Sequence, residues 1–331
     1  MRINKINNFT RRSVFFLISL FLLPLGMPAS ALLYQAGGSI YCMEEKDSTW
    51  KNIGKGFEIQ TNTKIKTDDK SIAVIQINKN VNLYMRSGSI LQITAAGQKT
   101  AVTLIQGSLH VTSLAYVEDF IVSGAMRDLK IDSKNCLIKN MNNILLVSVF
   151  DGRVTIKDRE KGYVISQGNG SSIAPGQSDL QMFSLPYPPV VEYPENKSVI
   201  TSGIDLKWTG MNEAILYRLE ISRDKDFINM AKAEEVNGTS CGLDNVPEGE
   251  YFWRVSSISR KNLEGIFLDS NTFVLQKGSA SLTITKKEEV KNMTVSSDED
   301  LTREPIPGEN TKNSIIFGTM ILLSIIILIV L

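Results

Sequence analysis

Cysteine and histidine are scarce in this sequence of 331 residues. Its three cysteines, Cys42, Cys136 and Cys241, are too few and too widely spaced for a disulfide framework, and an odd number leaves at least one unpaired. Its one histidine, His110, has no second histidine or paired cysteine at a spacing that a zinc site or a catalytic triad requires. Composition therefore excludes a small disulfide-stapled fold and offers no metal chemistry.

Serine-containing turns such as those at Gly88 and Gly124 do not form a G-x-S-x-G elbow. Motifs for phosphate binding are missing as well, since the sequence contains no G-x-x-x-x-G-K or G-x-G-x-x-G pattern. The nearest approach, Gln167–Gly170, is flanked by strand-like residues and predicts a hairpin turn. His110 alternates with Leu109 and Val111, which favours a solvent-facing position on a strand. We predict no catalytic, cofactor-binding or metal-binding residue, and we do not expect an enzyme.

Two acidic runs and three aromatic residues have ordinary structural interpretations. Asp68–Asp69 and Ser297–Asp300 lack the alternating oxygen ligands of a calcium loop, so solvated charge is expected. Trp208, Tyr251 and Trp253 could line a glycan surface, but aromatic side chains bury large areas in sandwich cores, and core packing is favoured. The sequence does not identify the binding residues.

Neither sign of charge dominates. The sequence has 36 Lys and Arg against 35 Asp and Glu, a formal net charge of +1. A balanced chain carries no bulk attraction to nucleic acid or to acidic lipid. No nucleic-acid partner is predicted.

The N-terminal segment has the organisation of a secretory signal peptide. Arg11 and Arg12 are among the basic residues that precede an apolar run over Val14–Leu25, and the small-residue stretch Ala29–Ala31 follows. We predict a signal peptide over residues 1–31, cleaved after Ala31. A retained N-terminal anchor is the alternative, which the prolines and glycine just past the apolar run disfavour.

The C-terminal segment predicts a membrane anchor. Residues 314–331 are almost entirely apolar and uncharged, and as a helix they nearly match the ~30 Å hydrocarbon core. A buried core helix is the alternative, disfavoured because residues 277–313 before it are polar and charged. That polar stretch cannot bury enough apolar surface to order itself, and it predicts a flexible stalk. A single-pass membrane protein with its bulk periplasmic or extracellular is expected.

Between these ends the sequence is of the all-β type. Residues 32–185 contain short strand-like runs punctuated by Gly, Asn, Asp and Ser, which predict a sandwich, barrel or rolled sheet. Lys134–Asn143 is polar and predicts a loop. The proline-rich joint Leu185–Pro189 marks a domain boundary, because proline cannot donate to a sheet ladder.

Residues 186–276 alternate apolar and polar residues over several long runs and predict an antiparallel sandwich. The alternation puts one set of side chains on a core face and leaves the opposite face in solvent. The core-facing set is Leu206, Trp208, Tyr217, Leu219 and Ile221.

The first β block resembles the FecR domain family. The family pattern begins with a Trp, a Gly and an apolar residue, followed by an I-x-T segment. Its later half contains a V-x-x-G-x-V segment and a Gly near the end, and residues of this sequence follow the same order. They are Trp50, Gly54, Phe57–Ile59, Ile65–Thr67, Leu104–Val111, Phe120–Val122, Val149–Val154 and Gln167–Gly168. This sequence departs from the family at two places. Asn78–Asn80 stands where the family has a Gly-Ser turn, and Leu129–Asp132 stands where the family has a Gly-Thr pair. The resemblance implies a rolled β domain in the cell envelope.

The second block resembles the fibronectin type III or immunoglobulin-like modules of bacterial surface proteins. The residues that carry this resemblance are Leu206–Trp208, Tyr217–Ser222, Asp226–Phe227, Gly249–Val255 and Gly265. It implies a β-sandwich placed between the first block and the stalk.

Three functions are open on this basis. The favoured one is a membrane-anchored, non-enzymatic binding or scaffolding protein of the bacterial envelope, with an envelope protein or glycan as partner. The alternative is a FecR-like sensor in transmembrane signalling, but the segment before Val14 is much shorter than the cytoplasmic domain that such regulators use. An enzyme has no motif behind it.

Overall fold

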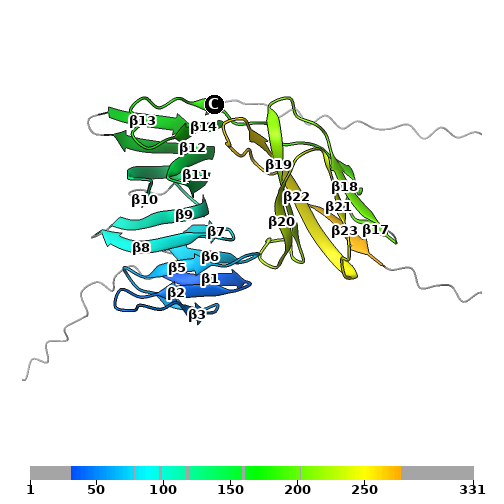
Figure 1. Cartoon of the computed structure of the whole chain (residues 1–331), viewed down its shortest axis with the longest axis horizontal. Coiled ribbons are helices and arrows are strands. Elements are labelled where there is room, and N and C mark those ends of the chain that lie inside the picture. Colours follow the sequence, from blue (N-terminus) through cyan, green and yellow to red (C-terminus); the bar gives the residue numbers. More distant parts are fainter. Residues whose placement is uncertain are drawn as a thin grey trace, which may run out of the picture. The chain divides into compact units, whose positions relative to one another are not determined.

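The computed structural model describes residues 31–77, 80–96, 99–116, 120–158, 161–201 and 203–276. These residues form 23 strands and no helix, which confirms the all-β class for this part of the chain (Figure 1). Accordingly, no helix in the described ranges is long and apolar enough to cross a membrane. The predicted stalk and anchor, and the predicted signal peptide apart from Ala31, lie outside the described residues.

The first fifteen strands belong to one sheet, which we call the first body. Its strands are β1 (Ala31–Gly37), β2 (Ile40–Met43), β3 (Lys51–Ile53), β4 (Glu58–Ile59), β5 (Lys64–Thr67), β6 (Ile72–Ile77), β7 (Val81–Met85), β8 (Ile90–Ala96), β9 (Lys99–Ser113), β10 (Phe120–Gly124), β11 (Arg127–Met141), β12 (Ile144–Asp158), β13 (Lys161–Ser166), β14 (Asn169–Ile173) and β15 (Phe183–Ser184). The main path runs β15-β14-β12-β11-β10-β9-β7-β6-β1-β4, and pairing is antiparallel except between β9 and β10.

Two glycines let the longest strands change partners. The first part of β9 pairs with β8 and its last part with β7, and Gly107 lies at the change with φ of 92°. A Cβ there would lie 2.6 Å from the Cα of Ser89, so only glycine fits. In β12 the first part pairs with β14 and the last with β13, and Gly152, φ 89°, lies between them. These corners allow the sheet to roll around its own core.

Side-chain alternation fills that core. Along β7, Val81, Leu83 and Met85 are buried, and the residues between them are only half-buried. Isoleucine, valine and leucine dominate the cluster, with Cys42 and Cys136 buried among them. All three cysteines of the chain are free, Cys241 being partly exposed. Burial raises the pKa of the Cys136 thiol to about 12, so this thiol is an apolar filler of the core.

The remaining strands form two sheets packed as a sandwich, which we call the second body (Figure 1). Its strands are β16 (Val191–Tyr193), β17 (Ser198–Ile200), β18 (Ile204–Trp208), β19 (Ala214–Ser222), β20 (Met230–Val236), β21 (Ser240–Leu243), β22 (Gly249–Ser259) and β23 (Asn271–Leu275). The sheets run β16-β18-β21 and β17-β23-β22-β19-β20.

The aromatic core of the second body follows the predicted alternation. All five residues expected on the core face are at most 5% exposed. The Trp208 ring lies 5.7 Å from that of Tyr217 and 6.5 Å from that of Trp253, and Tyr251 stacks on Phe273 at 5.3 Å. Core packing of Trp208, Tyr251 and Trp253 is therefore confirmed, and these rings are not a glycan platform.

The loop predicted over Lys134–Asn143 is wrong. Residues up to Met141 belong to β11, and Asn142 and Asn143 form a two-residue turn into β12. Both asparagines have positive φ, 52° and 63°, which asparagine tolerates and which tight hairpins favour. The polar composition suggested a loop, but these polar side chains have partners in the folded chain. Lys139 pairs with Glu264 of the second body, and Asn140 donates to the carbonyls of Leu104 and Ile105 in the first.

The turn predicted at Gln167–Gly170 exists, but it does not close a hairpin. β13 and β14 each pair with β12, at different parts of that strand, and not with each other. The amides of Gln167 and Gly168 donate to the carbonyls of Gly152 and Val149. The segment therefore turns the corner alongside Gly152.

Two isoleucines of the β11–β12 hairpin test this packing. Ile138 is fully buried, whereas Ile144 is 39% exposed. We expect Ile138→Ala to lower the free energy of unfolding by about 2–5 kcal/mol through lost burial and a cavity. Ile144→Ala should cost about 1 kcal/mol or less. Urea denaturation of the full chain, followed by far-ultraviolet circular dichroism, compares them, and equal costs would contradict the assigned burial.

Candidate functional site

One buried carboxylate joins the two bodies. Glu264 lies between β22 and β23 and is 1% exposed. It accepts two hydrogen bonds from the Arg86 guanidinium, Nη1 to Oε2 and Nη2 to Oε1, both 2.8 Å. The Lys139 ammonium approaches Oε2 to 2.6 Å. Arg86 follows β7, and Lys139 lies in β11, so two strands of the first body converge on one residue of the second.

A second carboxylate extends this network. Glu220 lies in β19 and is 2% exposed. Its Oε2 accepts from Nε and Nη2 of Arg254 on the neighbouring β22, at 2.9 and 2.6 Å. Its Oε1 lies 3.4 Å from Nε of Arg218 and 3.5 Å from Nε of Arg86. We call these six side chains the ion cluster; they are Arg86, Lys139, Arg218, Glu220, Arg254 and Glu264.

Aromatic rings cover one side of the ion cluster. The Arg254 guanidinium lies 3.9 Å from the ring centroid of Phe227 and 4.4 Å from that of Phe267. Arg86 lies 5.8 Å from the Phe267 centroid. Planar guanidinium groups stack on aromatic faces and give up their hydration more readily than ammonium groups. The rings therefore help to keep the charges dry.

Close backbone contacts accompany the ions. Gly37 of β1 is so near the second body that an added Cβ would lie 1.9 Å from the carbonyl oxygen of Ile228. Gly170 of β14 also approaches the second body, less closely, since an added Cβ would lie 3.1 Å from Cδ1 of Leu263. The two bodies therefore meet through packed surfaces as well as through charge.

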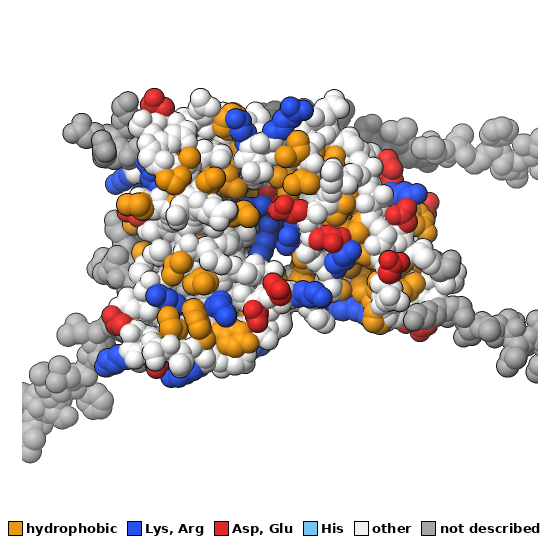
Figure 2. Space-filling model, viewed as in Figure 1, with side chains coloured by type: hydrophobic (Ala, Val, Ile, Leu, Met, Phe, Trp, Pro, Cys, Tyr) orange, Lys and Arg blue, Asp and Glu red, His pale blue; other side chains and the backbone are white. Residues whose placement is uncertain are grey.

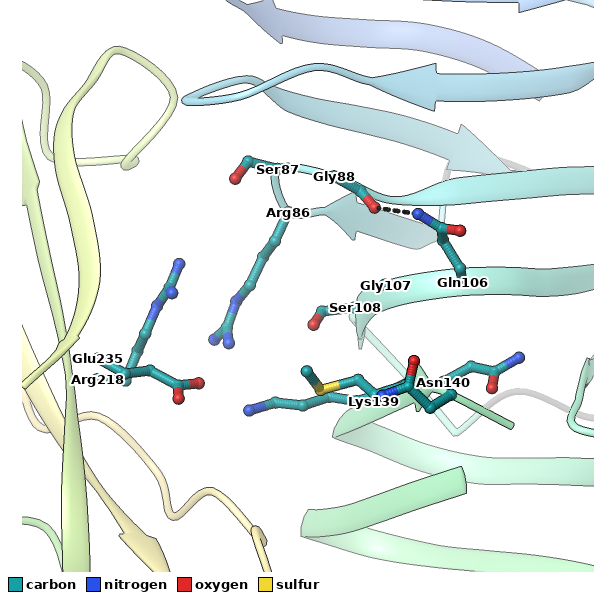
Figure 3. Close-up of a pocket in the computed structure, with 12 residues that line it drawn as sticks. Arg86, Ser87, Gly88, Gln106, Gly107, Ser108, Lys139, Asn140, Arg218 and Glu235 are labelled. Carbon is teal, nitrogen blue, oxygen red and sulfur yellow. Dashed lines mark hydrogen bonds between the residues drawn. The ribbon is translucent and has the colours of Figure 1, made fainter. Parts of the chain in front are cut away.

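A pocket of ≈ 370 Å³ opens beside the ion cluster. In Figure 3, Arg86 and Lys139 point toward it from the first body, and Arg218 and Glu235 face it from the second. The remaining wall is mostly polar, with Gln106, Ser108 and Asn140 among its residues, and it also includes Met141. In Figure 2, basic side chains gather at the centre of the view beside acidic ones.

The cluster's charges are maintained by their mutual attraction. Burial alone would raise the pKa of Glu220, but three arginines outweigh it and lower the pKa to about 2; they are Arg254, Arg86 and Arg218. Burial likewise opposes the charge of Glu264, yet Arg86 and Lys139 hold its pKa well below the usual range. The pKa of Arg86 is raised because the two carboxylates outweigh its burial. All three groups stay ionised at neutral pH.

The alternation of His110 with Leu109 and Val111 predicted a solvent-facing side chain, but the side chain is not in open solvent. It is half-buried, with its Nε2 2.6 Å from Oδ1 of Asn135 and its ring 5.9 Å from that of Tyr84 and 6.1 Å from that of Phe150. Burial lowers its pKa to about 4, so the ring is neutral at physiological pH. No nucleophile stands next to it among the described contacts, and we assign it a packing role.

The other predicted sites stay apart. Asp68 and Asp69 lie in the turn between β5 and β6, and no group of three or more metal-ligating residues occurs in the described part of the chain. Ser297–Asp300 lies outside the described residues.

Sequence reasoning missed the ion cluster because it placed the second face of β19 in solvent. Arg218 and Glu220 occupy that face, and the first body covers it. The pairing of β19 with β22 could have indicated the cluster. Arg218, Glu220 and Arg254 are charged residues that alternate with core residues on adjacent strands, which suits cross-strand ion pairs. Nothing in the sequence pointed to Arg86 or Glu264 as their partners.

No family model matches this chain, and no curated protein matches it. Among solved structures, two candidate anti-sigma factors from Parabacteroides distasonis ATCC 8503 are similar at 13% and 10% identity, with TM-scores of 0.32 and 0.33. The likeness covers 37% of this chain and 59% of the first structure, and 53% of this chain and 84% of the second. The chicken CNTN1 FN1–FN3 domains are similar at 11% identity, covering 76% of this chain and 95% of that one, with a TM-score of 0.21. At such values none of these likenesses identifies a family or a function.

Acid should weaken the folded state through Glu220. Its folded pKa, about 2, is below its ordinary value of 4.5, so its contribution is fully present above pH 4.5 and is lost as the pH falls through 2. The loss should be on the order of 3 kcal/mol. Urea denaturation between pH 6 and 2 measures it. Glu220→Gln should flatten the profile, and an unchanged slope in that variant would contradict the assignment.

Removing the charge of Glu264 should be more damaging than removing a pocket carboxylate. Glu264→Gln leaves Arg86 and Lys139 without their shared counter-ion, so we expect it to lower the free energy of unfolding by about 3–5 kcal/mol. Glu235→Gln removes the same charge at the pocket wall, where the side chain is partly exposed, and should cost little. Thermal unfolding of both variants compares them. Similar losses would show that Glu264 does not join the bodies.

Proposed function

We propose that the chain is a membrane-tethered, non-enzymatic binding protein of the bacterial cell envelope. Its first body would be a FecR-like domain and its second a fibronectin type III or immunoglobulin-like module, over residues 32–185 and 186–276. Together they would stand outside the cytoplasm on a stalk over residues 277–313 and an anchor over residues 314–331. The partner would be an envelope protein or a glycan.

The observation that carries this proposal is the pocket lined by charged residues of both bodies. Arg86 and Lys139 come from one body, and Arg218 and Glu235 come from the other. A binding site between two modules is a common arrangement for ligands, and its volume lies within the range of about 300–1,000 Å³ that small-molecule sites occupy.

The ion cluster favours a binding function over a signalling function that requires the two bodies to move relative to each other. Glu264 is held by two first-body cations at 2.6–2.8 Å, so the pocket walls are fixed to each other before a ligand arrives. Preorganised walls reduce the entropy cost of binding. The FecR-like sensor remains the alternative function, and it requires, in addition, an output across the membrane.

Affinity capture with matched variants tests the proposal. The full chain in detergent is immobilised and exposed to a solubilised extract of bacterial envelopes, and retained proteins and glycans are identified. Wild type should retain a specific partner, and Arg218→Gln should retain markedly less of it, because Arg218 lines the pocket. Lys207→Gln is the control, since Lys207 is exposed, outside the pocket and loses the same charge. If wild type retains nothing specific, the binding function is wrong.

A further inference from the structure

The pocket carries an excess of positive charge close to its wall. Four cationic side chains meet three carboxylates in and behind this wall. The cations are Arg86, Lys139, Arg218 and Arg254, and the carboxylates are Glu220, Glu235 and Glu264. Arg86 and Lys139 are 8% and 6% exposed, so their fields are poorly screened by water. An anion would complete the balance.

Some donors at the wall remain available to a ligand. The Lys139 ammonium has three N–H groups, and Glu264 accepts from one side of it at 2.6 Å. Arg218 contacts Glu220 through Nε at a long 3.4 Å, and its side chain lines the pocket (Figure 3). Planar guanidinium groups pair with carboxylate and phosphate through two parallel hydrogen bonds.

Acceptors are present beside these donors. The Glu235 carboxylate points into the pocket in Figure 3. Asn140 gives its Nδ2 to the carbonyls of Leu104 and Ile105, which leaves its side-chain oxygen as an acceptor. Gln106 gives its Nε2 to the carbonyl of Gly88 and likewise keeps an oxygen. A bare anion would use none of these acceptors, and it would be repelled by Glu235. Hydroxyl groups on the same ligand would use them.

We propose that this pocket binds a sugar-sized anion that carries hydroxyl groups, such as a uronic acid or a phosphorylated sugar. Arg218 and Lys139 contact its acidic group, and Glu235, Asn140 and Gln106 accept from its hydroxyls. The proposal rests on the proposed binding function and names the ligand class of the same pocket. A neutral sugar is disfavoured, because the described residues lining this pocket include no aromatic ring on which its face could stack.

Two substitutions with opposite expected effects provide the test. Arg218→Gln removes a cation and should weaken binding about tenfold or more, the usual loss of a charge-assisted hydrogen bond. Folding should survive, since Glu220 keeps Arg254 and Arg86 beside it. Glu235→Gln keeps an accepting oxygen but removes a repulsive charge, so the acid should bind as tightly or more tightly. A folding defect cannot strengthen binding, which separates the electrostatic effect from damage to the structure.

Isothermal titration of the full chain in detergent, at low salt, supplies the measurement. The probes are glucuronate, glucose 6-phosphate, glucose and inorganic phosphate, with Lys207→Gln as the control variant. Binding of either acidic sugar supports the proposal and tells carboxylate from phosphate. It is overturned if neither acidic sugar binds, if glucose or inorganic phosphate binds equally well, or if Arg218→Gln binds like wild type. Partner capture that persists after such a failure would leave the proposed binding function standing.

Discussion

The contact of Glu264 with Arg86 and Lys139 is the constraint on which the joint between the two bodies depends. A carboxylate that is 1% exposed is costly to bury, and it is tolerated because two cations lie within 2.8 Å of it. Neither partner comes from its own body. The charge therefore imposes a specific docking of the two bodies, since any displaced arrangement would strand ions away from both water and counter-ions. Apolar contacts such as that of Gly170 with Leu263 add buried contact area, but they restrict the relative orientation of the two bodies less than the ion pairs do.

The contact with Glu264 also depends on the geometry of the rolled sheet in the first body. Lys139 can meet Glu264 only because β11 continues as a strand past Ser133, and Arg86 only because β7 ends where β9 turns at Gly107. The hydroxyl of Ser89, held against the backbone of Ser108, fills the space that a side chain at position 107 would need. Corner geometry in the first body thus decides where its cations point. The pocket is a consequence of the same corner, since Gly107 and Gly88 line it.

Much of the fold was predictable from the sequence, and the site was not. Alternation correctly placed Leu206, Trp208 and Leu219 in a core, because a strand with one buried face repeats every two residues. The same rule failed for Glu220, and the composition of Lys134–Asn143 wrongly put Lys139 in a loop, because polar residues on a face buried against another body resemble solvated ones in the sequence. Whether such a face is covered depends on contacts between residues as far apart as Arg86 and Glu264. No local pattern records them.

The positive charge of the pocket wall follows from incomplete neutralisation of the ion cluster. Glu264 serves two cations, and Glu220 is surrounded by three, so each carboxylate is shared and some positive charge is left over at the wall. A fully balanced network would stabilise the joint without offering anything to a ligand. A network with a partly exposed arginine at its edge keeps the joint intact and retains attraction for an anion. Under the proposed binding function, structural and recognition roles are divided between residues, with Arg86 and Glu264 holding the bodies together and Arg218 contacting the ligand.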